Sequence, residues 1–176
     1  MAELIFNTTE GQTVARETLV LFLNTGTASA PTWAPVGVRV TSSSAEYDWQ
    51  RDTSQDILGN AYSEMKKPII TQSFDPWPMS NGDSALLKLW NTGIKDQDAQ
   101  AMAAQDMLVV HKYAGTKETA VFAERYAACA VEINSIGGEG GGSLGMPITV
   151  TYGGTRTVGS AKALDGVVEF TPDSDL

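Results

Sequence analysis

Alternation of apolar and polar residues with a period of two is the feature that most constrains the fold of this chain. In "AEYDWQRD" (45–52), Ala45, Tyr47 and Trp49 alternate with charged or amide residues, and "VFAERYAACAVEIN" (121–134) alternates over a longer distance. Successive side chains of a strand point to opposite faces, so the pattern predicts half-buried strands rather than helices. In the longer segment it places one set on a shared face: Val121, Ala123, Arg125, Ala127, Cys129, Val131 and Ile133.

Shorter apolar segments, bounded by Gly, Pro, Asn, Asp or Ser, predict the remaining strands. These segments are residues 18–23, 36–40, 68–74, 107–113, 148–152 and 166–170. Only "NGDSALLKLWNTGIK" (81–95) has helical spacing, with Asp83 or Ser84 as the expected N-cap and Gly93 as the expected stop. The pattern leaves residues 96–105 open between helix and loop. The predicted fold is mostly β: a β-sandwich or barrel with one short helix packed on it.

The length of 176 residues predicts one domain, 1–176, which is long enough to bury a hydrophobic core. The polar stretch at about 41–65 is expected to project as a hairpin or loop, and both termini, including the acidic tail 171–176, are expected to be short and flexible. The N-terminus lacks the basic and apolar regions of a signal peptide, which predicts a chain that stays in the cytoplasm. A single cysteine agrees with a reducing compartment.

Net charge restricts the partners. The chain has 21 acidic and 12 basic residues, a net charge of −9. Proteins that grip nucleic acid need Lys and Arg to displace the counterions of the phosphate backbone, so this composition argues against a nucleic-acid-binding role. The acidic surface serves either solubility alone or a specific function, and composition does not decide between them.

A glycine-rich segment, "INSIGGEGGGSLGMPITVTYGG" (133–154), contains two strings that resemble catalytic motifs. The string G-x-G-x-x-G (140–145) binds dinucleotides only where a helix follows, and a β-branched strand is expected here instead. The string G-x-S-x-G (141–145) requires a strand before Ser143, a helix after it and a histidine later in the chain. His111 precedes the serine, so hydrolase chemistry is disfavoured, and we expect no enzyme activity.

Metal and cofactor sites are not expected either. One histidine and one cysteine cannot form a zinc cage within a chain, so His111 is expected in a strand with a satisfied ring and Cys129 in the core. Tryptophans could form a carbohydrate platform, but three are expected to pack in the interior: Trp33, Trp49 and Trp90. Trp77 is the candidate for an exposed or interfacial position.

Taken in order, several segments resemble the major tail (tail tube) proteins of long-tailed, non-contractile (siphovirus-like) bacteriophages. The segments are "LFLNTGTASAPTWAPVG" (21–37), the polar hairpin 42–74, "DSALLKLW" (83–90), "VEINSIGGEGGG" (131–142) and the following strand with Thr149, Thr151, Gly153 and Gly154. Two features depart from that family: the Pro-Trp-Pro sequence 76–78 and the longer "MAAQ" stretch (102–105) after the helix.

The resemblance implies a structural virion protein that forms hexameric rings, which stack into a tail tube. The implied partners are further copies of the chain, a tape-measure protein, a tail terminator and distal tail or baseplate proteins, with DNA passing through without specific binding and no membrane involved. Such a tube is assembled in the host cytoplasm and resides in the virion tail. The alternatives are the inner tube of a contractile tail or tailocin, and a β-sandwich module for virion decoration or carbohydrate binding.

Within this resemblance, the sequence suggests two roles at residue level. DNA slides best along a wall without attractive Lys or Arg contacts, so the polar side of the 45–52 strand is expected to line the lumen. Its members are Glu46, Asp48, Gln50 and Asp52. The glycines are expected to turn the chain and to permit close backbone packing. They are Gly137, Gly138, Gly140, Gly141, Gly142 and Gly145.

Overall fold

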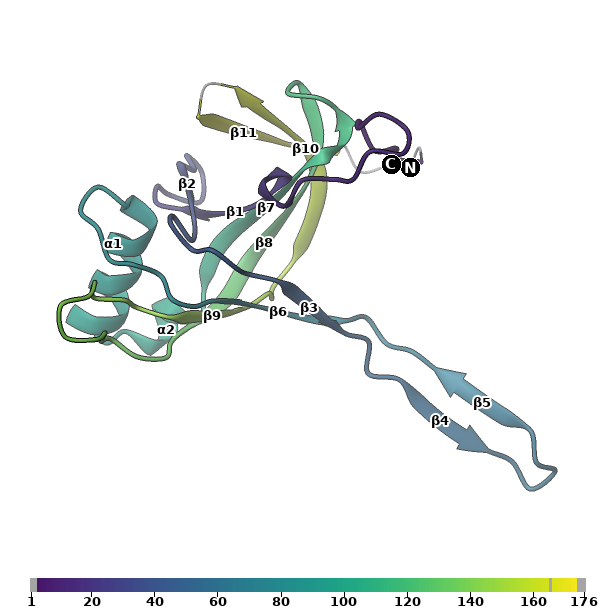
Figure 1. Ribbon diagram of the computed structural model, residues 1–176. Helices are drawn as coiled ribbons and strands as arrows, with labels where there is room; N and C mark the ends of the chain where they lie inside the picture. The colour runs from purple at the N-terminus through teal and green to yellow at the C-terminus, as the bar shows by residue number, and fades with distance from the viewer. Residues whose placement is uncertain (1–2, 165, 174–176) are drawn as a thin grey trace.

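A nine-stranded antiparallel sheet runs through the molecule in the computed structural model, which describes residues 3–164 and 166–173 (Figure 1). Its central order is β2-β1-β7-β8-β9-β6-β3, with β10 pairing to β8 and β11 to β10. The strands are β1 (Leu19–Asn24), β2 (Trp33–Pro35), β3 (Ala45–Asp48), β6 (Ile69–Phe74), β7 (Gln105–Thr116), β8 (Ala120–Ile133), β9 (Ile148–Thr151), β10 (Arg156–Leu164) and β11 (Val167–Pro172). The predicted mostly β fold is confirmed.

Strand β8 belongs to both parts of this sheet. Its first half pairs with β10 and its last residues pair with β9, while β7 runs beside it. Gln105 of β7 lies opposite Cys129, but Met107 lies opposite Tyr126, so three residues of β8 correspond to two of β7. An extra residue of this kind is a β-bulge, and it reverses which face the following side chains occupy.

The bulge overturns the predicted face of residues 121–133. Val121 and Ala123 pack in a second, smaller core cluster, whereas Cys129 and Val131 pack in the main one. Ala127, predicted to be on the apolar face, is exposed. The alternation is correct on each side of the bulge, but its phase changes between them.

Two cores result. The main core lies between the two parts of the sheet and extends under helix α1 (Ser84–Trp90), where Leu86 and Leu89 are buried. The second core covers the opposite face of β1 and β7, with Phe22 and Leu108 at its centre and Phe170 of β11 packed against it. The β10–β11 hairpin therefore closes one side of the molecule (Figure 1).

Asp83 is the N-cap of helix α1, one of the two residues predicted for that position. The Asp83 side chain accepts a hydrogen bond from the Leu86 backbone N–H at 3.1 Å and a second from Trp77 Nε1 at 3.1 Å. Trp77 is thereby fully buried, and its predicted exposed or interfacial position is wrong. Its indole lies in the main core because the capping carboxylate satisfies the buried N–H group.

Gly93 does not end the helix. A π-helical turn, η2 (Asn91–Lys95), continues from α1, and the short helix α2 (Ala99–Met102) follows with Asp98 as its N-cap. A Cβ at Gly93 would lie 2.6 Å from Ile133 Cδ1, so the glycine provides close packing against β8 rather than a stop signal. Residues 96–105 thus contain α2 and the start of β7.

Several boundaries differ from the sequence pattern. Segments at β1, β6, β7, β9 and β11 are strands as predicted, but residues 36–40 form a turn closed by the Val40 N–H and the Gly37 carbonyl at 3.0 Å. Strand β10 has no counterpart among the predicted strands because its small residues give little apolar alternation. The tail 171–176 is ordered at its start, where Thr171 and Pro172 belong to β11. The flexible termini expected at 1–2 and 174–176 lie outside the described residues.

None of the helices in the described ranges has the length and hydrophobicity needed to cross a bilayer.

The glycine-rich segment forms the connection between β8 and β9. The backbones of Gly137 and Gly145 exchange two hydrogen bonds, of 3.1 and 2.8 Å, across the neck of the loop. Within it, Gly141 has a φ of 82°, in the left-handed region that favours glycine. A Cβ at Gly138 would lie only 2.4 Å from the Ser143 carbonyl oxygen. Strand β9 rather than a helix follows Ser143, so the nucleophile-elbow geometry is not formed.

We predict that Gly138→Ala lowers the free energy of unfolding by about 1–3 kcal/mol, because the added methyl group meets a backbone oxygen that must move. Gly140→Ala is the matched control, since a Cβ there has no atom within 4 Å. Urea denaturation of the two variants measures the difference. Equal stability of both would contradict the close approach described at Gly138.

Candidate assembly surfaces

One face of the β3-β6-β9-β8 part of the sheet carries mostly polar side chains. Glu46 of β3 lies opposite Thr71 of β6, Thr71 opposite Thr151 of β9, and Thr151 opposite Ala130 of β8. In the next row, Ser73 lies opposite Thr149, which lies opposite Glu132. Because directly paired residues share a face, these side chains form one surface, which we call the polar face. Its members are Glu46, Asp48, Ile69, Thr71, Ser73, Ala130, Glu132, Thr149 and Thr151. Ile69, opposite Asp48 and 45% exposed, is an apolar member at the end of the face nearest the arm.

The polar face carries carboxylates and hydroxyls but no basic side chain among its paired positions. Thr149 Oγ1 accepts a hydrogen bond from Asn134 Nδ2 at 2.9 Å and lies 3.5 Å from Ser73 Oγ. Some hydroxyl groups of the polar face are therefore hydrogen-bonded within the chain. On the opposite face of these strands, Ile148 and Val150 of β9 are fully buried in the main core, whereas Tyr47 of β3 is 49% exposed. One side of this sheet is therefore core, and the other is an acidic, hydroxyl-rich wall.

The four residues expected to line a lumen are not on one continuous strand. Glu46 and Asp48 both lie on β3, exposed, on the polar face. Gln50 follows in a turn, with a φ of 46° and its N–H donating to Asp48 Oδ1 at 3.0 Å. Asp52 begins the next strand, β4 (Asp52–Gln55). The turn at Gln50 interrupts the alternation, so the structure brings Glu46 and Asp48 together with the threonines instead.

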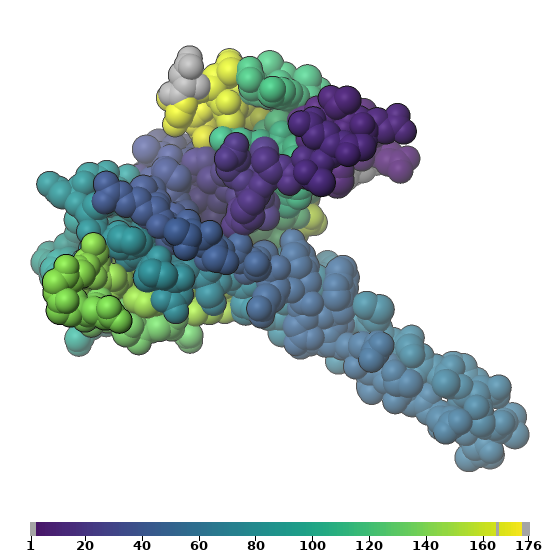
Figure 2. All heavy atoms as spheres, in the orientation of Figure 1, coloured from purple at the N-terminus to yellow at the C-terminus, as the bar shows by residue number. Residues whose placement is uncertain are grey.

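Between β3 and β6 the chain forms a projection, residues 49–68, which we call the arm (Figures 1 and 2). Strand β4 pairs with β5 (Ala61–Glu64), and these two strands form a separate two-stranded sheet. At its tip, Asp56 accepts hydrogen bonds from the N–H groups of Leu58 and Asn60, at 2.8 and 2.9 Å. A side-chain hydrogen bond from Asn60 Nδ2 at 2.9 Å, together with these backbone bonds and one from Tyr62 Oη, lowers the pKa of Asp56.

The arm exposes large apolar side chains that a monomer leaves uncovered. These are Trp49, Ile57, Leu58, Tyr62 and Met65. Trp49 is 48% exposed, so its expected position in the interior is wrong: its strand leaves the body before the indole can reach the core. An isolated two-stranded ribbon is marginally stable in water, and exposed apolar groups mark contact surfaces. The arm is therefore a candidate contact with another molecule.

In the main sheet, three strands have an open edge among the described residues: β2, β3 and β11. The β3 edge lies directly beside Glu46 and Asp48 of the polar face. An open edge presents backbone N–H and C=O groups that can pair with another chain. Pairing at β3 would extend the polar face into the neighbouring molecule.

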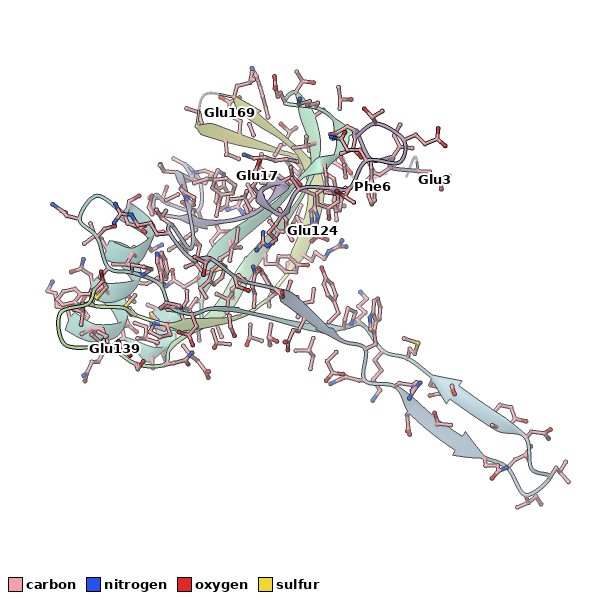
Figure 3. All side chains as sticks on the ribbon, in the orientation of Figure 1. Glu3, Phe6, Glu17, Glu124, Glu139 and Glu169 are labelled. Carbon is pink, nitrogen blue, oxygen red and sulfur yellow. The ribbon has the colours of Figure 1, made fainter. Side chains whose placement is uncertain are left out.

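A buried charged cluster lies where the arm leaves the body, and Figure 3 labels Glu124 there. Glu124 accepts hydrogen bonds from Arg156 Nε at 3.0 Å and from Arg156 Nη2, and its Oε2 lies 3.3 Å from His111 Nε2. His111 Nδ1 lies 2.8 Å from Tyr113 Oη, so its ring has partners on both sides, as predicted. Glu124 points away from Val121 and Ala123 of the second core, but it is still buried, because the other face of this part of β8 lies against the main core, where Tyr126 packs.

Burial and hydrogen bonding act in opposite directions on the pKa values of this region. Burial alone raises the pKa of Glu124, but hydrogen bonds from His111 and Arg156 outweigh it, so the pKa lies below its ordinary value of 4.5. Burial raises the pKa of Tyr126 to about 12 and that of the fully buried Cys129 thiol to about 11. Cys129 is thus an unreactive core residue, as predicted.

A second set of polar contacts continues from this cluster to the root of the arm. Tyr152 Oη donates to Gln72 Oε1 at 2.6 Å, and Gln72 Nε2 donates to Ser43 Oγ at 2.9 Å. Ser43 Oγ in turn donates to the Ser73 carbonyl at 2.7 Å. These bonds join β6 to the segment that leads into β3, so they hold the two strands from which the arm extends.

Within the described ranges, no group of three or more His, Cys, Asp or Glu side chains is placed to hold a metal ion. The G-x-S-x-G serine lies in an exposed loop, and His111 is engaged with Glu124 and Tyr113.

Comparison with known proteins gives a likeness in structure but none in sequence. The sequence matches no protein-family model and no curated protein. The fold is similar to the PVC sheath/tube terminator of an extracellular contractile injection system in its extended state, with a TM-score of 0.51 and 11% identity over 85% of this chain and 99% of that chain. This likeness establishes a shared fold.

Two further structures are similar at lower scores. One is a chain of the PVC sheath–tube complex in its extended state, with a TM-score of 0.47 and 10% identity over 86% of this chain and 94% of that chain. The other is the anti-feeding prophage cap, the AFP tube terminating cap, with a TM-score of 0.48 and 15% identity over 88% and 96%. All three are structural components of tubes or caps rather than enzymes.

We predict that Glu124→Gln lowers the free energy of unfolding by about 1–3 kcal/mol at pH 7, because Arg156 and His111 lose a charged acceptor. The folded-state pKa of Glu124 is lowered, so its contribution is present above pH 4.5 and is lost as the pH falls further. The difference between wild type and variant should therefore shrink as the pH is lowered toward 3.

The matched control is Glu132→Gln, an exposed carboxylate on the same strand. Its effect at pH 7 is expected to stay within about 0.5 kcal/mol. Chemical denaturation across the pH range measures both variants. A Glu124→Gln deficit that is the same at pH 7 and pH 3 would show that the carboxylate charge is not what stabilises the cluster.

Proposed function

We propose that this chain is a structural subunit of a tail tube, whose copies form hexameric rings that stack into a hollow conduit for DNA. The observation that carries the proposal is the polar face, a sheet surface with core on its other side and no basic side chain among its paired positions. The fold that the chain shares with a tube terminator supports the same role.

The polar face suits the wall of a channel for DNA. Lys and Arg bind phosphates by releasing counterions, and each such contact retards movement of the polymer. Carboxylates repel phosphates, and the Thr and Ser hydroxyls bind them only weakly without a nearby cation. In this proposal Glu46, Asp48 and Glu132 face the lumen, while the net charge of −9 keeps the remaining surface unattractive to DNA.

The open strand edges supply the means of ring formation. If the β3 edge pairs with a strand of the next copy, the polar face continues from subunit to subunit, and closure of the ring removes the exposed edges. The arm, residues 49–68, makes contacts outside its own subunit in the same assembly. The proposed partners are other copies, a tape-measure protein within the lumen, a terminator at one end and distal tail or baseplate proteins at the other.

A contractile system is the second candidate. The sheath/tube terminator that shares the fold belongs to a contractile injection system, which favours an inner tube or its terminator over a non-contractile tail tube. In that case a sheath protein surrounds the tube. In both cases the protein resides in the assembled tail after assembly in the host cytoplasm. Co-purification of a sheath-like partner with the native particle separates the two candidates.

Electron microscopy of the purified protein tests the proposal directly. Rings or hollow tubes are expected at high protein concentration. A protein that remains monomeric at every concentration and salt condition would overturn the tube assignment.

We predict that replacing Glu46, Asp48 and Glu132 together by Lys leaves assembly intact but slows DNA ejection by about tenfold or more, because every ring then presents cations to the phosphates. The control replaces three exposed acidic residues away from the polar face by Lys: Glu10, Glu139 and Glu169. Ejection from particles, measured by fluorescence of released DNA at several salt concentrations, compares the two. Normal ejection from the first variant would exclude the polar face as the lumen wall.

A further inference from the structure

The tip of the arm is the most exposed apolar part of the described chain. Ile57 is fully exposed and Leu58 is 81% exposed, and both lie in the connection between β4 and β5. This connection is the far end of the projection in Figures 1 and 2. Asp56 holds the turn through hydrogen bonds to its own neighbours, so both aliphatic side chains are presented on an ordered loop. An ordered apolar tip that no part of its own chain covers needs a receiving surface elsewhere.

A groove beside the root of the arm has the matching character. It is a cavity of about 360 Å³ between the start of β1 and the segment 36–43. Its floor consists of Leu21, Val36, Val40 and Phe74, which also pack in or against the main core. Ser42 and Ser43 line one border.

The charges at the tip and at the groove are complementary in part. Arg16 borders the groove and donates hydrogen bonds only to backbone carbonyls, those of Leu19 and Ser43, at 2.8 to 3.1 Å. Among the described residues neither Arg16 nor Asp56 forms an ion pair. Glu17, labelled in Figure 3, borders the same groove, so the rim carries one charge of each sign and Arg16 is the group that can meet Asp56.

A tip cannot enter the groove of its own chain. The arm extends away from the body, and its tip lies at the opposite end from the segment 36–43 at its root (Figures 1 and 2). The occupant must therefore come from a second molecule.

We propose that Ile57 and Leu58 of one copy insert into the groove formed by Leu21, Val36, Val40 and Phe74 of a second copy, with Asp56 beside Arg16. The inference rests on the proposed function for the identity of the partner. Because tip and groove are different surfaces of one chain, the contact is heterologous and each copy both gives a tip and receives one. Such a contact propagates from copy to copy, as a stacked or ring-shaped assembly requires.

Cross-linking between two singly substituted proteins tests this contact. Leu58→Cys at the tip is mixed with Ser42→Cys or Val40→Cys at the groove under mild oxidation, and products are separated on a non-reducing gel and identified by peptide mass spectrometry. The native Cys129 is fully buried and does not compete. A disulfide-linked heterodimer of tip and groove variants is expected, because a disulfide forms only where the two Cα atoms come within about 7 Å.

The control pairs Leu58→Cys with Gly140→Cys, an exposed loop position outside the groove. Equal cross-linking to Gly140→Cys would mean random collision and would overturn the proposal. The exposed N-terminal segment is the competing occupant, so Ile5→Cys is mixed with the groove variants in parallel. Cross-linking of Ile5→Cys in place of Leu58→Cys would also overturn it.

A second measurement uses assembly itself. Leu58→Ser is expected to raise the protein concentration needed for assembly by about tenfold, since a buried leucine side chain is lost from each contact. Leu144→Ser, which alters an exposed leucine of the glycine loop, is the matched control and should leave the concentration needed for assembly unchanged. Tubes that form without tip–groove cross-links would refute the contact alone. Cross-links without any ring or tube would refute the proposed function and leave the contact standing.

Discussion

The extra residue in β8 is the constraint on which the rest of the structure depends. Before it, β8 pairs with β10 and contributes Val121 and Ala123 to the second core; after it, β8 pairs with β9 and contributes Cys129 and Val131 to the main core. A strand of uniform alternation would present one apolar face to one core. The change of phase lets a single long strand serve both parts of the sheet.

A carboxylate is buried at this junction, because both faces of this part of β8 lie against a core. Glu124 lies just before the bulge and points between the two parts of the sheet, where an unpaired charge would be strongly destabilising. Arg156 and His111 supply the compensating hydrogen bonds. Together with the Tyr152–Gln72 bond, this cluster replaces apolar packing at the end of the main core from which the arm extends.

The errors of the sequence pattern have a common origin in contacts between distant residues. Trp77 is buried rather than exposed because its indole N–H donates a hydrogen bond to Asp83. Trp49 is exposed rather than buried because the chain that carries it leaves the body of the molecule. Gly93 resembles a stop signal, but its contact with Ile133, forty residues later, determines its role. Strand β10 was missed because its pairing with β8 and β11, rather than its own hydrophobicity, makes it a strand.

What the sequence determined by itself is local. Alternation of polar with apolar residues in 45–48 and 148–151 already assigns a polar side and an apolar side to each of these strands, and Asp83 already marks the start of a helix. Only the tertiary structure decided that those polar sides join Glu46 and Glu132 into one face, and that the arm extends clear of the body. The physical reason is that side-chain direction follows from consecutive backbone geometry, whereas strand partners, register and the position of the bulge depend on contacts between residues far apart in the chain.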